Sequence, residues 1–288
     1  MKQFSGRIAF VTGGASGIGY GLVQNFLGLG MKVVAVDFNR EYLEEKQAAL
    51  AGRKDVRFVY ADVGDRDHVR AAADEAISAF GKIHVLCNNA GVAGGGDTHD
   101  PDFEAWDRAL RINLGGVVNG VKLITPLILS HGEGGHIVNT SSMAGIVPLP
   151  LRGLGAYQTA KFAVRGFTES LRMSLAPHGI GVSCLFPGGT RTRIVEASAK
   201  NEAARAAAAE MTASWMDPVE LGAFVVEGIR NNTPYILTHS EFRDEVRELY
   251  GVLDSAFPRN QQVPAGRKAF EDQRRDMVNQ RRALPVKD

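Results

Sequence analysis

Short apolar runs alternate with longer amphipathic segments along most of this 288-residue chain. Seven runs rich in β-forming residues predict strands at Arg7–Thr12, Lys32–Asp37, Val56–Ala61, Ile83–Cys87, His136–Thr140, Gly181–Phe186 and Tyr235–Thr238. Helical periodicity predicts helices between them, near residues 17–29, 40–51, 66–80, 102–131, 157–176, 193–212 and 218–231. Short apolar strands separated by helices are typical of a parallel sheet covered on both faces. We therefore expect an α/β fold with a single doubly wound parallel sheet of about seven strands.

The pattern changes near the C-terminus. No internal repeat, low-complexity linker or change of composition interrupts residues 1–253, so we expect one domain there. From Asp254 the chain becomes polar, and residues 254–288 are predicted to be a C-terminal extension. Acidic residues interrupt the basic pairs Arg274-Arg275 and Arg281-Arg282, which favours a solvated or subunit-docked helix over an arm that binds nucleic acid.

Charge and hydropathy narrow the choice of partners. The chain has 33 lysines and arginines against 32 aspartates and glutamates. This balance gives no electrostatic reason to expect nucleic acid or an anionic membrane as a partner. The best candidate for a membrane span, residues 115–129, is shorter than the roughly 18 residues required and is interrupted by Asn119 and Lys122.

Three further features argue against a secreted, a disulfide-bonded or a metal-binding protein. The first residues contain no apolar signal segment with a cleavage site, so we expect a cytoplasmic protein. Cys87 and Cys184 lie inside apolar, strand-like runs, which predicts buried thiols in a reducing compartment. The seven histidines show no metal-ligand spacing, so no metal is expected.

The segment after the first predicted strand is rich in glycine. It reads Thr12-Gly13-Gly14-Ala15-Ser16-Gly17-Ile18-Gly19, and a helical pattern follows at once. Glycines let the backbone turn sharply and approach a diphosphate, while the helix N-terminus offers unpaired N–H groups and a favourable dipole. The spacing differs from G-x-G-x-x-G, so an ordinary glycine-rich turn is the alternative. The strand–turn–helix context favours a dinucleotide site at Thr12, Gly13, Ser16, Gly17, Ile18 and Gly19.

Asp37 closes the second predicted strand, 18 residues beyond Gly19. A carboxylate there accepts hydrogen bonds from both ribose hydroxyls of an adenosine and repels a 2′-phosphate. Ser16 and Phe38 carry no charge that would compensate, whereas Arg40 offers partial compensation. We therefore predict NAD rather than NADP as the cofactor.

Tyr157 and Lys161 indicate proton transfer to or from an alcohol. In a helix, their spacing of four places a phenol and an ammonium on one face. A free phenol has a pKa of about 10, and a fixed positive charge beside it lowers that value. Because a tyrosine four residues before a lysine is common by chance, the pair gains its weight from the motifs around it.

Several motifs occur in one order along the chain. They are Thr12-Gly13-x-x-x-Gly17-x-Gly19, Asp62-Val63, Asn88-Asn89-Ala90-Gly91, Asn113, Ser142, Tyr157-x-x-x-Lys161, and Pro187-Gly188 followed by Thr190 and Thr192. With these residues the chain resembles the short-chain dehydrogenase/reductase family across about residues 5–240. The resemblance implies a Rossmann-type sheet. It also implies cofactor contacts at the adenine ring, the central sheet and the nicotinamide carboxamide, namely Asp62 and Val63, Asn89-Ala90-Gly91, and Thr190 and Thr192 after Pro187-Gly188.

Four residues carry the catalysis that the resemblance implies. Tyr157 would act as acid/base on the reacting oxygen, and Lys161 would lower the phenol pKa and hold the nicotinamide ribose. Ser142 would hydrogen-bond the substrate oxygen, and Asn113 would keep a water in the proton relay to Lys161. The cofactor moves the hydride, so the protein need only orient the carbon and manage one proton.

The catalytic serine departs from the family pattern. Ser142 lies 15 residues before Tyr157, a longer separation than the family usually shows. The extra length falls in residues 146–155, which we interpret as an enlarged loop over the substrate. Ser141 is the competing assignment, and Ser142 is preferred because it directly precedes Met143-Ala144-Gly145.

The substrate is less well defined. Apolar residues in the predicted pocket walls, 92–100, 143–155 and a lid at about 189–216, favour a bulky, apolar or aromatic secondary alcohol. The alternative is that these side chains pack against the lid or a neighbouring subunit. Residues 232–258 are also diffusely similar to bacterial Cα-dehydrogenases that act on lignin-derived aryl ethers.

The predicted function is hydride transfer between NAD and a secondary alcohol or its ketone. The resemblance implies a homodimer or homotetramer built on the helices that contain Asn113 and Tyr157. A catalytically silent NAD-binding sensor or interaction protein on the same fold is the alternative. The intact set of catalytic residues argues against it, because a protein without turnover has no chemical need for them.

Overall fold

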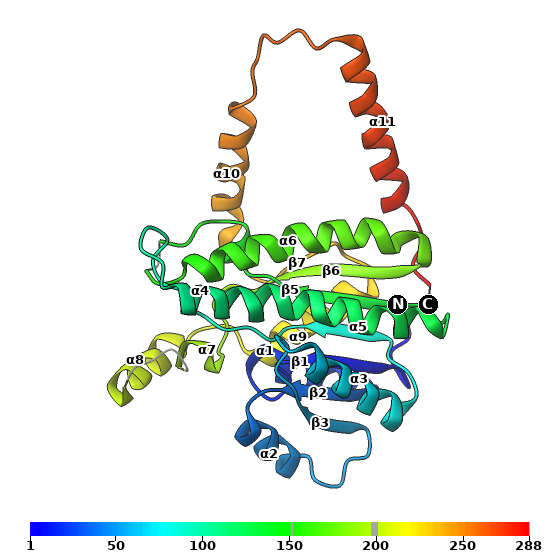
Figure 1. The fold of residues 1–288 in the computed structure, drawn as a ribbon, viewed down its shortest axis with the longest axis vertical. Helices are drawn as coiled ribbons and strands as arrows, with labels where there is room; N and C mark the ends of the chain where they lie inside the picture. The colour runs from blue at the N-terminus through cyan, green and yellow to red at the C-terminus, as the bar shows by residue number, and fades with distance from the viewer. Residues whose placement is uncertain (151, 197–200, 288) are drawn as a thin grey trace.

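Seven parallel strands form the central sheet of the computed structural model, which describes residues 1–150, 152–196 and 201–287 (Figure 1). Within these residues the strand order is β3-β2-β1-β4-β5-β6-β7, and every neighbouring pair is parallel. The strands are β1 (Ile8–Thr12), β2 (Lys32–Asp37), β3 (Val56–Tyr60), β4 (Val85–Asn88), β5 (Gly135–Thr140), β6 (Ile180–Phe186) and β7 (Tyr235–Leu237). The predicted α/β fold with a single parallel sheet is confirmed.

Helices cover both faces of this sheet. They are α1 (Gly17–Gly28), α2 (Arg40–Ala49), α3 (Arg66–Phe80), α4 (Phe103–Leu110), α5 (Gly116–Ser130), α6 (Gly155–Leu175), α7 (Arg193–Glu196), α8 (Glu202–Thr212), α9 (Pro218–Arg230), α10 (Arg243–Ser255) and α11 (Ala265–Arg282). Phe26 of α1 and Leu221 of α9 belong to the apolar cluster on one face. Ala73 of α3, Ile124 of α5 and Leu175 of α6 belong to the cluster on the other.

The strand order reverses between β1 and β4. From β1 the chain moves outward to β2 and β3, and it then returns to β4 on the other side of β1. In open parallel sheets, ligands bind outside the carboxyl ends of the strands at such a point. Every residue of β1, β4, β5 and β6 is buried, so this edge is supported by a tightly packed core.

Helix boundaries differ from the prediction in two places. The helix expected over 102–131 contains a π-helical turn, Arg111–Gly115, between α4 and α5, where the Asn113 amide donates to the Ala109 carbonyl at 2.9 Å. The helix expected over 193–212 becomes α7 and α8, and residues 197–200 lie outside the described residues. α10 spans Arg243–Ser255, and the division of the chain expected between residues 253 and 254 stays a prediction.

The helical run from Phe103 to Ser130 is long and apolar enough, by length and composition alone, to cross a membrane. Half of its most apolar window is buried inside the protein. Ile124 and Ile128 are fully buried in the cluster that α3, α5 and α6 form against the sheet. Core packing therefore accounts for the apolar character of this run.

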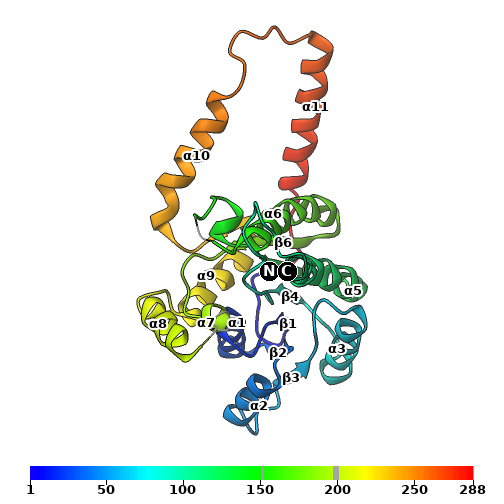
Figure 2. The same ribbon diagram turned by 60° about the vertical axis from the view of Figure 1, so that its left-hand side comes forward.

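The C-terminal extension projects from the body. α10 and α11 extend beyond α6 as two sides of an arch, joined by residues 256–264 (Figures 1 and 2). At the first base of the arch, Val246 and Leu249 pack against the body. At the second base, Arg281 donates to the Met173 carbonyl at 2.8 Å, and the N–H of Lys287 donates to the Gly179 carbonyl at 2.9 Å. Both ends of the arch are thus fixed.

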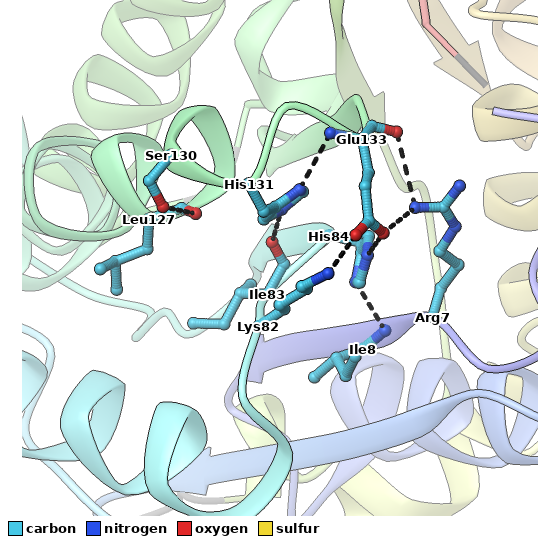
Figure 3. A network of polar contacts seen from close by, with 9 residues as sticks. All are labelled: Arg7, Ile8, Lys82, Ile83, His84, Leu127, Ser130, His131 and Glu133. Carbon is cyan, nitrogen blue, oxygen red and sulfur yellow. Dashed lines mark hydrogen bonds and ion pairs between the residues drawn. The ribbon is translucent and has the colours of Figure 1, made fainter.

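A polar network lies at the amino ends of the strands, opposite the carboxyl ends at which a ligand is expected (Figure 3). Glu133, just before β5, accepts hydrogen bonds from Arg7 at 2.9 Å and from His84 at 3.0 Å, and it pairs with Lys82. Nδ1 of His84 accepts the N–H of Ile8 at 3.2 Å. The Glu133 carboxylate therefore joins the beginnings of β1, β4 and β5.

His84, His131 and Glu133 lie close enough together to hold a metal ion, a grouping that the sequence spacing did not predict. Their hydrogen bonds argue against such a site. Because Nδ1 of His84 accepts the Ile8 N–H, its Nε2 carries the proton that is donated to Glu133. Likewise, Nδ1 of His131 accepts the Glu133 N–H at 3.1 Å, and its Nε2 donates to the Ile83 carbonyl at 2.8 Å. Both ring nitrogens of each histidine are thus engaged, and the group acts as a structural clamp.

The clamp makes stability depend on pH. Hydrogen bonds from Lys82 and His84 lower the pKa of Glu133 from 4.5 to about 2. Because the folded-state pKa is depressed, the stabilisation is complete above about pH 4.5 and is lost as the pH falls toward about 2. Glu133→Gln should therefore lower the free energy of unfolding in urea near about pH 6, and its difference from wild type should shrink near about pH 3.

Circular dichroism during the urea titration checks this prediction. Glu75→Gln, an exposed change on α3, serves as the control and should leave the unfolding free energy close to wild type at both pH values. An equal loss of stability in Glu133→Gln at both pH values would contradict the proposed role of the carboxylate.

Candidate active site

The turn between β1 and α1 requires glycine at several positions. Gly13 and Gly17 have positive φ angles of 65° and 49°, and a Cβ on Gly19 would lie 1.9 Å from the Gly13 carbonyl oxygen. Ser16 is the N-cap residue of α1, and its side chain makes no capping hydrogen bond. Ile18 packs against the core beneath the helix. The turn thus offers a close backbone approach and a helix N-terminus, which together fit a diphosphate.

Asp37 ends β2 and is buried. Its Oδ2 accepts the N–H of Ala15 and its Oδ1 accepts the N–H of Asn39, each at 3.1 Å. Burial raises the pKa of this carboxyl, and the backbone hydrogen bonds oppose that shift. The Arg40 guanidinium lies 3.9 Å from the centroid of the Tyr60 ring. The carboxylate is therefore fixed to the glycine turn, at the strand end where ribose hydroxyls bind in folds of this type.

Thr12 joins the ends of β1 and β4. Its hydroxyl accepts the N–H of Asn89 at 2.9 Å and of Ala90 at 3.0 Å, and the Asn89 amide donates to the Thr12 carbonyl at 3.0 Å. The next residue is Gly91, where a Cβ would lie 2.7 Å from the Asn113 Oδ1 and 3.5 Å from the Lys161 Nζ. The loop after β4 therefore connects the glycine turn to the predicted catalytic residues.

Tyr157 and Lys161 lie on the first turns of α6. The Lys161 Nζ is 5.5 Å from the centroid of the Tyr157 ring and donates to the Thr140 carbonyl, at the end of β5, at 2.9 Å. The Lys161 side chain is buried and Tyr157 is half-buried. The helical spacing of four thus brings the phenol and the ammonium together, as the sequence predicted.

Burial governs the pKa of both groups. It lowers the pKa of Lys161 to about 8, and it raises the pKa of Tyr157, against a hydrogen bond with Ser142 that lowers it. The lowering of the phenol pKa that the sequence predicted is thus outweighed by desolvation in the protein alone. The Lys161 ammonium uses one of its hydrogen bonds on the Thr140 carbonyl at the end of β5.

The structure separates the two candidate serines. The Ser141 hydroxyl donates to the Lys161 carbonyl at 2.7 Å and so ties β5 to α6. Ser142 caps the short 3₁₀ turn Met143–Gly145, where its Oγ accepts the N–H of Ala144 at 3.1 Å. Its hydroxyl donates to the Pro187 carbonyl at 3.5 Å, and it lowers the pKa of Tyr157 against the effect of burial. The contact of Ser142 with a substrate oxygen stays a prediction.

Asn113 lies within the π-helical turn and is fully buried. Its Oδ1 accepts the N–H of Val92 at 3.1 Å, and its amide donates to the carbonyls of Val92 and Ala109, each at 2.9 Å. π-helical turns are frequent at functional sites. The Asn113 side chain thus fixes the loop that contains Gly91 beside Lys161. Because its side-chain amide is engaged in these hydrogen bonds, the expected role of Asn113 in a water relay stays a prediction for its backbone groups.

Asp62 and Val63 follow β3. The Asp62 Oδ2 pairs with Arg111 at 2.9 Å, and its Oδ1 accepts the N–H of Gly64 at 2.8 Å. Val63 is buried, and its carbonyl accepts the Asn119 amide at 2.9 Å. Both residues are thus anchored to the helices that cover the sheet, and their contact with an adenine ring stays a prediction.

The segment after β6 lies against the glycine turn. A Cβ on Gly17 would lie 2.9 Å from the Cβ of Thr192, and Thr190 is buried and pairs with Met216. The Pro187 carbonyl accepts the N–H of Met143 at 2.9 Å, next to Ser142. The predicted nicotinamide segment therefore lies between the glycine turn and the serine.

His239 holds this segment and was missed by the sequence interpretation. Its Nδ1 accepts the N–H of Gly188 at 3.0 Å, so its Nε2 carries the proton donated to the Gly189 carbonyl at 2.9 Å. A Cβ on Gly188 would lie 2.7 Å from the imidazole, and one on Gly189 would lie 3.0 Å from Trp215. A lone histidine after a short strand carries no sequence signal for this role.

Three predicted substrate contacts belong to the core. Met143, Ile146 and Val147 are buried and pack with Phe186 and the beginning of α10. This packing is with the core rather than with a lid or a subunit, and the contact of these residues with a substrate stays a prediction. Leu151, in the same predicted loop, lies outside the described residues.

The profile of the short chain dehydrogenase family matches residues 7–203. A C alpha-dehydrogenase of Sphingobium sp. is 31% identical over 286 residues, 94% of this chain and 93% of that protein. A solved structure from Novosphingobium aromaticivorans, assigned to the short-chain dehydrogenases, has a TM-score of 0.87 at 35% identity over 99% of each chain. A Burkholderia phymatum short chain dehydrogenase/reductase solved with NAD has a TM-score of 0.79 at 31% identity, covering 92% of this chain and all of the other.

These similarities extend over the glycine turn, the catalytic helix and the sheet order that carries them. The resemblance expected from the motifs is confirmed, and the chain belongs to the short chain dehydrogenase family.

Proposed function

We propose that this oxidoreductase transfers a hydride between NAD and a secondary alcohol or the corresponding ketone, with Tyr157 as the acid/base. The observation that carries the proposal is the meeting of Ser142, Tyr157 and Lys161 beside the edge where the strand order reverses. A hydroxyl, a phenol and an ammonium grouped there supply the proton chemistry of alcohol oxidation and no nucleophile–histidine pair.

The residues present fit NAD. A Cβ on Gly19 would collide with the Gly13 carbonyl, so the turn has the close backbone approach that a diphosphate needs. The Asp37 carboxylate, fixed by Ala15 and Asn39, suits the 2′- and 3′-hydroxyls of an adenosine ribose and disfavours a 2′-phosphate. The NAD found in the Burkholderia phymatum structure supports the same cofactor here.

The protein's share of the reaction is the proton. NAD held by the glycine turn and Asp37 would supply the acceptor for the hydride of the carbinol carbon. Ser142 hydrogen-bonds the substrate oxygen, and ionised Tyr157 removes the proton from that hydroxyl as the C–O bond becomes a carbonyl. Lys161 stabilises the phenolate by its charge. In the reverse direction, protonated Tyr157 returns the proton to the oxygen of the ketone.

The substrate class we propose is a bulky, apolar or aromatic secondary alcohol. The similarity to the C alpha-dehydrogenase covers 94% of this chain and 93% of that protein. We further propose that the enzyme acts in the cytoplasm as a homodimer or homotetramer.

Replacing the acid/base tests the mechanism. Tyr157→Phe should reduce kcat by at least about 100-fold, because general acid–base catalysis typically contributes that much or more. NADH affinity, measured by fluorescence titration, should stay within a few-fold of wild type. Tyr235→Phe on β7, which loses a phenol bonded to Glu169, is the matched control and should retain activity.

Retained turnover in Tyr157→Phe would refute the proposed role. If the unmodified protein bound NADH but oxidised none of a panel of aliphatic, alicyclic and benzylic alcohols, the sensor function would be favoured instead. Absorbance at the NADH maximum gives this second readout.

Replacing the ribose-binding carboxylate tests the cofactor. Asp37→Asn keeps the shape of the side chain and removes its charge, so it should raise the ratio of kcat/KM with NADP to that with NAD by about tenfold or more. Asp74→Asn, an exposed change on α3, removes the same charge elsewhere and should leave the ratio unchanged. A wild-type preference for NADP would contradict the cofactor assignment.

A further inference from the structure

The arch formed by α10 and α11 carries an apolar stripe on α11. Phe270 and Met277 lie seven residues apart on α11 and are 65% and 51% exposed, and Val263 and Leu284 flank the helix at the same spacing and are 49% and 40% exposed. A seven-residue apolar repeat keeps one face of a helix apolar along its whole length. Such a face normally packs against another helix.

A second stripe lies on α10. Val246 and Leu249, at its beginning, pack against the body. Leu253, on α10, and Phe257, just after it, continue the apolar side beyond the body and are 53% and 73% exposed, whereas the Tyr250 hydroxyl accepts a hydrogen bond from Arg165 of α6. Figures 1 and 2 show the two helices on separate sides of the arch, so neither covers the other.

The two helices carry opposite charge. α10 has four acidic and two basic residues, a formal charge of −2. α11 has six basic and three acidic residues, a formal charge of +3. A surface that attracts α11 is thus present on α10, yet the arch holds the two apart within one chain.

We propose that the arch docks onto the arch of a second copy of this chain, with α10 of each copy against α11 of the other. A two-fold axis makes both contacts at once, because each copy offers the same two surfaces. The apolar stripes would then be buried together and the charges of the two helices would be complementary.

Nucleic acid is a poorer occupant of the same surface. Lys268 pairs with Asp272 at 2.8 Å and Arg274 with Glu271 at 2.9 Å, so part of the positive charge of α11 is already neutralised. The exposed Phe270 and Met277 would have no role against phosphates.

Docking would also support the turn Met143–Gly145, which Ser142 caps. The importance of this support rests on the proposed function. Val246 and Leu249 of α10 pack in one cluster with Met143, which directly follows Ser142. A partner helix that orders α10 therefore orders the support beneath the serine.

Light scattering coupled to size-exclusion chromatography tests the interface without relying on activity. The wild type should have a mass that is an even multiple of the 31.0 kDa subunit. Phe270→Glu and Met277→Glu should each halve that mass, because each places a charge in the stripe. Asn279→Glu adds the same charge on the opposite side of α11, two residues from Met277, and should keep the wild-type mass.

A wild-type monomer, an unchanged mass in both stripe variants, or an equal loss in Asn279→Glu would overturn the proposal. Circular dichroism of the variants checks that the body remains folded. NADH binding gives a separate readout of the cofactor site, so failure of the interface and failure of the proposed function are distinguishable.

Cross-linking tests which helices meet. Two variants that each add one exposed cysteine, Leu253→Cys in α10 and Phe270→Cys in α11, are mixed and treated with a short bismaleimide. Only the added cysteines should react, because Cys87 and Cys184 are buried. The mixture should give more covalent dimer than either variant alone. Equal yields in the mixture and in the separate variants would overturn the exchange of α10 and α11.

Discussion

The site depends on the hydrogen bonds that the Thr12 hydroxyl accepts from the loop after β4. This hydroxyl accepts the N–H groups of Asn89 and Ala90, so it joins β1 and β4 at the point where the strand order reverses. The following residue, Gly91, has no room for a Cβ beside Asn113 and stands next to Lys161. One buried hydroxyl thereby sets the position of the catalytic residues relative to the glycine turn.

Lys161 and Tyr157 show how burial and charge compete in the site. Burial lowers the pKa of the lysine to about 8 and raises that of the tyrosine, so it disfavours the charged form of each. An ammonium and a phenolate about 5 Å apart attract each other by about 3 kcal/mol at an effective dielectric constant of about 20, which corresponds to about two pKa units. That attraction exists only when the phenol is ionised. In the proposed mechanism the lysine therefore favours the ionised tyrosine, even though burial dominates in the neutral pair.

Local patterns in the sequence predicted much of the fold and the proximity of Tyr157 and Lys161, because strands, the glycine turn and a spacing of four residues are short-range features. The remaining features depend on segments that meet only after folding. His239 holds Gly188 from 51 residues away, and Glu133 joins three strands through a clamp with no sequence spacing of its own. The packing of Met143, Ile146 and Val147 in one cluster with residues of α10 was not predicted for the same reason, since apolar composition does not say which helix will pack against a loop.

Contacts within its own chain stabilise α11 only weakly. Isolated helices shorter than about 12–15 residues are marginal in water, and α11, with 18 residues, is only slightly longer and is fixed to the body near its C-terminal end. The exposed pair of Lys268 and Asp272 adds little to the stability of this helix, because solvent screens it. Full burial of Phe270 or Met277 would contribute about 1.5–3 kcal/mol for each side chain. In the part of the chain that the structure describes, both remain more than half exposed, so the largest source of stabilisation for α11 lies in a surface that another molecule must provide.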